Sequence, residues 1–355
     1  MPNTIIIGSG SCIPNRIIGR DHFMNSEFYT DEGDRLEKPN AEIIEKFVEI
    51  TEIERRRYIE DHEMNSDLAY KAAKEAIYDA QIDPEKLDYI IFASNFGEVN
   101  HDGMTNFMPS MSARVKNKLG IKNRKCINYD MIFGCPGWVE AMILADTIIK
   151  AKKAELILVV GSETLSRVTD PYDRNKMIFA DGAGAVVVKA TNEENVGIIA
   201  NNTICDNDGE LNFLENSPSL NKEVEQKTLY IRMHGRKIYE YALKNVPDAI
   251  KNTIDDAGIG IDDVDKILIH QANAKMDYAI ISRLFKLYGK SEYDHAISPM
   301  TIQEFGNSSV ATIPTLFDLI SKGELKGHRF KENGYIVFAS VGAGMNINAV
   351  VYKFP

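Results

Sequence analysis

Cys135 is the residue of this sequence best suited to nucleophilic chemistry. It stands in Phe133-Gly134-Cys135-Pro136-Gly137, and proline suits the first position of a helix. The sequence therefore predicts that the thiol lies at a helix N-terminus, where unpaired N–H groups and the helix dipole favour a thiolate and lower its pKa. The same N–H groups can stabilise an oxyanion on a thioester. A lone cysteine is more often a buried structural residue, but this glycine-rich context favours a nucleophile.

His270 and Asn307 are the next candidates. His270 follows a short apolar run, where a strand that ends at a sheet edge presents its side chains to a crevice. Asn307 lies in Phe305-Gly306-Asn307-Ser308-Ser309, and capping a helix is the commonest role of asparagine before small helical residues. Taken alone, each residue is as compatible with a structural role as with a catalytic one.

An internal repeat predicts how these residues are positioned. Residues 72–93 and 249–270 align without gaps, with eight identities in 22 positions, half a chain length apart. Each copy reads as an amphipathic helix, an acidic turn and a buried strand. Further along, Phe133-Gly134-Cys135 corresponds to Phe305-Gly306-Asn307, and residues 156–161 correspond to 335–339. Duplication would give two pseudo-symmetric βα halves, 1–190 and 191–355, that bring both helix starts towards a shared centre near His270.

Composition limits the classes of function. With 355 residues, 44% of them hydrophobic, the chain can bury a large core, and a net charge of -11 argues against a nucleic-acid binder. No secretory signal or membrane-length apolar run is present, so we expect a soluble, cytoplasmic protein. The cysteines show neither disulfide nor zinc spacing, so we expect free thiols and no metal. They are Cys12, Cys126, Cys135 and Cys205.

Taken together, the motifs resemble the β-ketoacyl-[acyl-carrier-protein] synthase III branch of the thiolase superfamily over nearly the whole chain. The cysteine, His270-Gln271-Ala272-Asn273 and Gly306-Asn307-Ser308-Ser309 occur in the family's order, and three further segments match. These are Asp181-Gly182-Ala183-Gly184-Ala185, Asp170-Pro171-Tyr172-Asp173-Arg174 and Gly342-Ala343-Gly344. The resemblance implies a thiolase fold, in which the two halves form five αβαβα layers.

It also implies a ping-pong condensation without metal or redox cofactor. Cys135 would accept an acyl group from an acyl-CoA or acyl-carrier-protein primer, and malonyl-carrier protein would then lose carbon dioxide and attack it. His270 and Asn307 would donate hydrogen bonds to the developing enolate. The amides of Cys135 and of the turn formed by Gly342, Ala343 and Gly344 would hold the acyl oxyanion. The partners expected from the family are an acyl carrier protein and a second subunit in a homodimer.

Related families provide the alternatives. Thiolases need a second cysteine near the C-terminus as a base. The last cysteine here is Cys205, so the sequence does not fit a thiolase. Hydroxymethylglutaryl-CoA synthases have a glutamate where Asn95 stands, although Glu98 is close in sequence. An acyltransferase that forms an ester or amide without decarboxylation could keep Cys135 and His270, and it is the strongest alternative. A pseudo-enzyme that supports an active paralogue would not need all three catalytic residue types.

The substrate-binding residues implied by the resemblance are Arg174, Asn273 and Met108. The tryptophan and arginine that the family uses at the CoA adenine are replaced near Lys46 and Ile50. We therefore expect a primer on a carrier protein, or a CoA held in an altered way. The alternative is that Phe47 or the arginines at 55–57 supply the missing contacts to the adenine. Met108 stands where the family often has a phenylalanine at the end of the partner's acyl pocket, in a segment a few residues longer than usual.

A basic stripe after His270 could dock the acidic carrier protein. Lys275, Arg283 and Lys286, together with Lys290, fall within about 80° of one another if a single helix carries them. An ordinary solvated helix face is the alternative.

Overall fold

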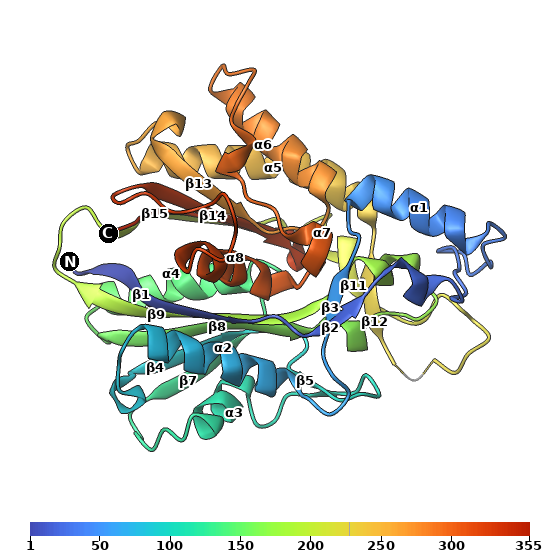
Figure 1. Ribbon diagram of the computed structural model, residues 1–355, viewed down its shortest axis with the longest axis horizontal. Helices are drawn as coiled ribbons and strands as arrows, with labels where there is room; N and C mark the ends of the chain where they lie inside the picture. Colours follow the sequence, from blue (N-terminus) through green and yellow to red (C-terminus); the bar gives the residue numbers. More distant parts are fainter. Residues whose placement is uncertain (227) are drawn as a thin grey trace.

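The structure is a computed structural model that describes residues 1–226 and 228–355. Five layers of helices and sheets alternate through the molecule (Figure 1). Two helices form the central layer, and a sheet lies on each side of them. Two more helices cover the outer face of each sheet. The central helices are α4 (Gly137–Lys150) and α8 (Thr312–Ser321), and the outer ones are α2 (Asn65–Asp79), α3 (Met111–Lys118), α5 (Gly235–Asp256) and α6 (Ala274–Leu287).

The first sheet has the strand order β1-β9-β8-β4-β7. β4 runs parallel to β7 and β8, and the pairs β8–β9 and β9–β1 are antiparallel. Its strands are β1 (Asn3–Cys12), β4 (Tyr89–Ala93), β7 (Ile127–Met131), β8 (Leu156–Thr164) and β9 (Asp181–Thr191).

The second sheet repeats this arrangement with the order β10-β15-β14-β13. β13 and β14 are parallel, and the pairs β14–β15 and β15–β10 are antiparallel. Its strands are β10 (Gly197–Cys205), β13 (Val264–Ile269), β14 (Tyr335–Gly342) and β15 (Asn346–Lys353). The order and direction match β1-β9-β8-β4, so the two pseudo-symmetric halves and the five layers predicted from the sequence are confirmed.

Burial explains why these segments form strands and central helices. Apolar runs such as 157–160 in β8 and 336–339 in β14 are fully buried, as expected of strands covered on both faces. Trp138 of α4 packs edge-on against Phe338 of β14, with ring centroids 5.8 Å apart. One core cluster joins residues of both sheets with α4 and α8. The two halves therefore share a core, and the predicted boundary after residue 190 falls at the end of β9.

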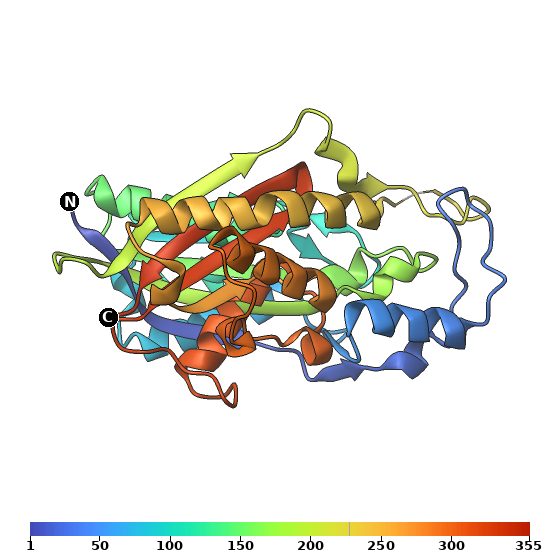
Figure 2. The same ribbon diagram turned by 90° about the horizontal axis from the view of Figure 1, so that it is seen from above.

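The smaller elements gather at the end of the molecule opposite the two termini (Figure 2). They include helix α1 and three two-stranded sheets, of which β11–β12 lies next to the site described below. Their bounds are α1 (Asn40–Thr51), α7 (Ile302–Phe305), β2 (Arg16–Ile18), β3 (Arg56–Tyr58), β5 (Glu98–Val99), β6 (Thr105–Asn106), β11 (Leu214–Ser217) and β12 (Tyr230–Met233). Among the described residues, no helix combines the length and apolarity needed to cross a membrane.

Candidate active site

Cys135 lies just before α4, at the inner end of a cavity of about 310 Å³. Pro136 caps the helix and Gly137 is its first residue, so the predicted position at a helix start is confirmed to within one residue. Gly134 has φ +69°, a conformation that favours glycine. Apolar side chains including Phe96, Leu165 and Phe179 line much of the cavity. This lining suits an acyl chain bound next to the sulfur.

The expectation of a low thiol pKa is not met in this structure. Desolvation by the surrounding protein raises the pKa of Cys135 to about 11, although a hydrogen bond with the Ser309 side chain and the residue's own backbone amide act in the opposite direction. Nearby Glu163 also disfavours the thiolate. The helix start is predictable from the sequence, but the burial of the sulfur is not, and this burial favours the thiol over the thiolate.

The turn of Gly342, Ala343 and Gly344 packs directly against the cysteine loop. A Cβ atom on Gly342 would lie 2.5 Å from the backbone nitrogen of Cys135, and one on Gly134 would lie 2.6 Å from the nitrogen of Ala343. Ala343 and Gly344 line the cavity beside Cys135. The turn predicted to help hold an oxyanion is therefore next to the nucleophile, and the close approach requires glycine at both contact points.

His270 follows β13, and its backbone N–H donates to the carbonyl of Ala339 in β14, at 2.9 Å. The side chain is buried, which lowers its pKa to about 4, while a hydrogen bond with the backbone of Ser309 acts in the opposite direction. Gln271 is also buried and holds the next loop through Pro299, Thr301 and Ile302. His270 is thus a fixed, neutral imidazole at neutral pH.

Asn307 is held by its backbone rather than by a helix cap. Its N–H donates to Ile178 and its carbonyl accepts from Ala180, at 2.9 and 2.8 Å. The side-chain oxygen accepts from the N–H of Ser309 at 2.8 Å, which orients the amide group. α8 begins later, at Thr312, so the structural alternative of an N-cap does not apply. The Asn307 side chain is buried next to the same residue that contacts Cys135 and His270.

Asn95 and Glu163 form part of the site that the sequence did not reveal. Asn95 lines the cavity with Cys135, and both its backbone N–H and its side-chain amide donate to Oε1 of Glu163, at 2.6 and 2.8 Å. Burial raises the pKa of Glu163 to about 8. Glu98 is instead bound to Ser66 outside the cavity, at 2.8 and 2.6 Å, so it does not supply the glutamate of a hydroxymethylglutaryl-CoA synthase.

A larger groove of about 910 Å³ runs between α1 and the start of α5. Lys46, Phe47 and Ile50 of α1 line it, as do Arg174 and Asn273. Asn273 also caps α6 by accepting from the N–H of Met276 at 3.1 Å. The predicted substrate-binding positions Arg174 and Asn273 therefore share one groove with the two positions where the family's tryptophan and arginine are replaced.

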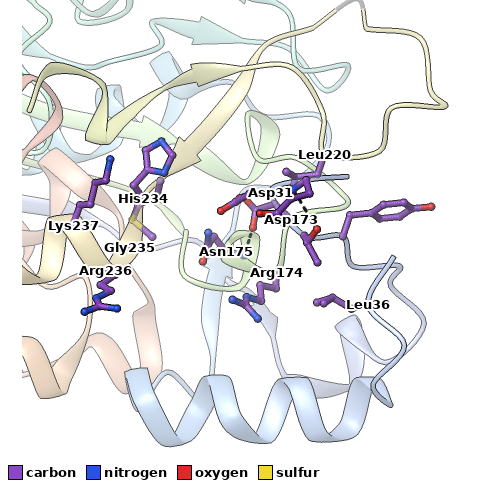
Figure 3. A pocket seen from close by; sticks show the side chains of 14 residues that line it. Asp31, Leu36, Asp173, Arg174, Asn175, Leu220, His234, Gly235, Arg236 and Lys237 are labelled. Atoms are coloured by element: carbon purple, nitrogen blue, oxygen red, sulfur yellow. Dashed lines mark hydrogen bonds between the residues drawn. The ribbon is translucent and has the colours of Figure 1, made fainter. Parts of the chain in front are cut away.

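Arg236 is a second cation in this region that the sequence analysis missed. It lines both the groove and an adjoining pocket of about 540 Å³, as Arg174 does. Figure 3 shows the two arginines arriving from different elements, the turn at 174–177 and the first turn of α5, with both guanidinium groups on the side that faces α1. Basic side chains from separate elements thus meet at the groove. Arg236 is paired there with Glu240 at 2.8 Å.

Arg232 anchors the β11–β12 hairpin beside this pocket. It lies 3.3 Å from Asp170 and 3.6 Å from Asp173, and it donates to the carbonyl of Pro218 at 2.8 Å. All three charged groups are buried. Because removing one partner of such a cluster leaves an uncompensated buried charge, this ion cluster fixes the hairpin next to Arg174.

The predicted basic stripe is only partly present. Lys275, Arg283 and Lys286 are exposed on α6, but the Arg283 guanidinium donates to the carbonyl of Leu243 in α5, at 2.9 Å. Lys290 was predicted to extend the helical stripe, and this is wrong. The helix ends at Leu287 because Tyr288 and Gly289 leave the helical conformation, and Lys290 pairs with Asp262 at 2.6 Å.

Met108 does not reach its own chain's cavity. It is 85% exposed in the segment after the β5–β6 hairpin, and none of the cavities described above includes it. The position is compatible with the predicted role at a partner's acyl pocket, which a single chain cannot display. Among the described residues, no cluster of three or more metal-binding side chains occurs.

Comparison with known proteins identifies relatives of the whole chain. The family described as 3-oxoacyl-[acyl-carrier-protein (ACP)] synthase III matches residues 129–207, and its C-terminal counterpart matches 254–354. Beta-ketoacyl-[acyl-carrier-protein] synthase III from Clostridium acetobutylicum is 32% identical over 360 residues, covering 100% of this chain and 99% of the relative.

Solved structures of similar proteins match nearly the whole chain as well. 3-Oxoacyl-[acyl-carrier-protein] synthase III from Aquifex aeolicus superposes with a TM-score of 0.81 at 27% identity, covering 99% of this chain and 100% of the other. The priming β-ketosynthase of the R1128 polyketide pathway shares the fold, with a TM-score of 0.80 at 23% identity, covering 99% and 96%. With the thiolase-like layers and full-length relatives at this level of identity, the chain belongs to the 3-oxoacyl-[acyl-carrier-protein] synthase III family.

Proposed function

We propose that this enzyme transfers an acyl group from a thioester primer to Cys135 and condenses it with malonyl-carrier protein. One observation carries the proposal: Ser309 lines an apolar cavity together with Cys135 and is also next to the buried His270 and Asn307. These three side chains are the set that thioester exchange and decarboxylation require in the family. The enzyme would serve fatty-acid or specialised lipid or polyketide synthesis.

The first half-reaction forms a thioester on the enzyme. The Cys135 sulfur attacks the primer carbonyl, the bond between this carbonyl and the carrier sulfur breaks, and the departing thiolate takes the proton that the cysteine loses. The amides of Cys135 and of the 342–344 turn would stabilise the oxyanion, and the close packing of Gly342 against the Cys135 backbone supports this role. Because burial raises the pKa of Cys135, the attack depends on removing this proton within the occupied site.

The second half-reaction breaks a carbon–carbon bond of the malonyl group. Carbon dioxide leaves, and its bonding electrons form an enolate whose oxygen would accept hydrogen bonds from His270 and Asn307. The enolate carbon attacks the acyl-enzyme carbonyl, and the Cys135 sulfur departs and regains a proton. A neutral imidazole can only donate through the nitrogen that carries hydrogen, and the low pKa of His270 keeps it neutral at working pH.

For the primer, we propose a carrier protein or a CoA held without the usual adenine contacts. Lys46 and Ile50 line the groove at the positions that lack the family's tryptophan and arginine. Arg56 is no substitute, because it is buried and donates to the carbonyls of Met177 and Ile18. Phe47 remains the aromatic candidate in α1, although it also packs against the protein core. Arg174 and Arg236 would still attract the phosphate groups of either donor.

A comparison of three donors tests this proposal. The same acyl chain is offered on carrier protein, on CoA and on pantetheine, and acylation of Cys135 is followed by intact mass. Losing adenine contacts worth about 1–2 kcal/mol lowers the affinity for CoA about tenfold, so the carrier should react at least tenfold faster than CoA in kcat/KM. Pantetheine, which has no phosphate for the two arginines, should react more slowly than CoA. A clear preference for CoA with a micromolar KM would contradict the proposal.

We further propose that the carrier docks on the exposed side chains of α6. Lys275 and Lys286 have no ion-pair partner among the described residues. The acidic group influenced by Lys275 is Glu49 of α1, whose pKa is lowered mainly by its ion pair with Lys46 and more weakly by Lys275. Lys275 also lines a hollow with Tyr278 and Tyr293. These groups would meet the acidic carrier despite the net charge of -11.

Charge reversal tests the docking surface. The double variant Lys275→Glu/Lys286→Glu is expected to raise the KM for malonyl-carrier protein about three- to tenfold, because each reversal turns a weak attraction into repulsion. The KM for malonyl-pantetheine should not change. Lys74→Glu/Lys86→Glu, on α2 and just after it on the other side of the molecule, is the control because it changes the net charge by the same amount. Equal effects on both malonyl donors would rule out docking at α6.

We also propose a homodimer that works in the cytoplasm, where acyl thioesters are made. β7 is an edge strand of the first sheet, with Ile127 and Tyr129 exposed and Phe107, Met108 and Ile132 as further exposed apolar side chains. An unpaired edge of this kind is a template for pairing with another chain. Sedimentation equilibrium should show a dimer, and a monomer at micromolar concentration would contradict this arrangement.

A further inference from the structure

Ser309 is next to all three proposed catalytic residues, yet no catalytic role has been assigned to it above. It lines the same cavity as Cys135, where its side chain favours the thiolate. Its N–H donates to the side chain of Asn307 at 2.8 Å, and its backbone raises the pKa of His270. The residue is buried and has φ +53°, which is uncommon for a residue other than glycine. Such strain persists where the surroundings require one position for a side chain.

Asn95 determines the direction of the Ser309 hydroxyl. The Asn95 side-chain nitrogen lies 2.8 Å from Oε1 of Glu163 and 3.4 Å from Oγ of Ser309. Oε1 also accepts from the backbone N–H of Asn95 and so acts as an acceptor whether or not Glu163 is protonated. The amide must therefore direct its NH₂ group to Oε1, and its second hydrogen is then available to Ser309. Because the hydroxyl oxygen accepts from Asn95, its own hydrogen is free for Cys135.

Glu163 keeps Asn95 in this orientation. The carboxylate also accepts from the backbone N–H of Asn95 at 2.6 Å, and Ser94 donates to its other oxygen at 3.2 Å. The side chain is fully buried at the end of β8 and so has few alternative positions. Asn95 therefore donates both to Glu163 and to Ser309, which leaves the Ser309 hydroxyl hydrogen to point towards the sulfur.

We propose that Ser309 is a further catalytic residue, whose hydroxyl donates a hydrogen bond to the Cys135 thiolate, and that Asn95 is a positioning residue held by Glu163. No proton passes along the chain, since the hydroxyl keeps its own hydrogen. The proposal rests on the proposed function only in taking Cys135 as the nucleophile. It adds the source of thiolate stabilisation in a site where burial opposes ionisation.

Alkylation of Cys135 by iodoacetamide tests the proposal without any thioester substrate. In this reaction a carbon–sulfur bond forms, iodide leaves and the thiol proton goes to water. The rate therefore depends on the fraction of Cys135 that is present as thiolate. Ser309→Gly removes the hydroxyl while allowing the positive φ. The rate is measured at neutral and mildly alkaline pH, and peptide mass analysis separates Cys135 from the other thiols.

We expect Ser309→Gly to slow alkylation about three- to tenfold. A hydrogen bond to a charged group affects the pKa by about one to two units, and the higher nucleophilicity of a more basic thiolate offsets part of the lost thiolate fraction. Asn95→Ala should slow the reaction less. If Asn95 acts through the hydroxyl, Ser309→Gly/Asn95→Ala should be no slower than Ser309→Gly alone.

Ser308→Ala is the matched control, because this neighbouring hydroxyl pairs with Thr312 at 3.3 Å. It should leave the rate unchanged. An unchanged or faster alkylation of Ser309→Gly would overturn the role of Ser309, and additive losses in the double variant would overturn the positioning role of Asn95. If thioesters fail to acylate Cys135 while Ser309→Gly still slows alkylation, the proposed function fails and this inference stands.

Discussion

Cys135→Ala is expected to abolish covalent transfer of the acyl group to the enzyme. Of the four thiols, Cys135 is the one that lies at the start of α4 and lines the apolar cavity. Intact mass after incubation with an acyl primer should show one added acyl group on the wild type and none on the variant. Condensation should fall to background, because no enzyme-bound acyl group is left for the enolate to attack.

Cys205→Ala is the control for this experiment, because Cys205 is an exposed thiol at the end of β10. The variant should acylate as the wild type does. A stoichiometric acyl group on Cys135→Ala, located by peptide mapping, would show that another residue is the nucleophile.

His270→Ala and Asn307→Ala are expected to retain acylation of Cys135 and to lose decarboxylation of the malonyl donor. Each change removes one hydrogen-bond donor from the proposed enolate site, and the loss of one such donor lowers a rate about 10²- to 10³-fold. Acylation is measured by intact mass and decarboxylation by carbon dioxide release. The acylation step in the same samples serves as the control for folding.

Near wild-type condensation in both variants would contradict the assignment of these donors. A parallel loss of acylation would also count against it, because it would indicate a general disturbance of the site. Asn307 is connected to Ser309, so a modest effect of its loss on acylation is compatible with the network.

The fold follows from the sequence because its signals are local and repeated. The repeat around residues 72–93 and 249–270 predicts the same helix and strand twice, and the structure places them as α2–β4 and α5–β13. Periodicity also marks the buried strands. What the sequence could not show is that the two halves share one core, since this depends on contacts between α4, α8 and both sheets.

The site was predictable where chemistry depends on residue type and motif. Cys135, His270 and Asn307 could be named, whereas the pKa of the thiol depends on desolvation within the folded cavity. Asn95 could be named only as a departure from a related family, and Glu163 could not be named. Their pairing is not visible in the sequence because one residue follows β4 and the other lies near the end of β8, and they meet only in three dimensions. Arg236 had no motif that would mark it. Helix periodicity does not reveal where a helix ends. Lys290 was therefore predicted to lie on the same helix as Lys275, although α6 ends at Leu287.

The central claim is decarboxylative condensation through an acyl-enzyme. It is tested most directly by allowing acylated enzyme, freed of excess primer, to react once with malonyl-carrier protein labelled in its free carboxyl group. We expect labelled carbon dioxide and β-ketoacyl-carrier product in equal amounts, while the acyl mass disappears from Cys135 at the same rate. Discharge of the acyl group to an alcohol or amine without release of labelled carbon dioxide would contradict the claim and would establish a non-decarboxylating acyltransferase.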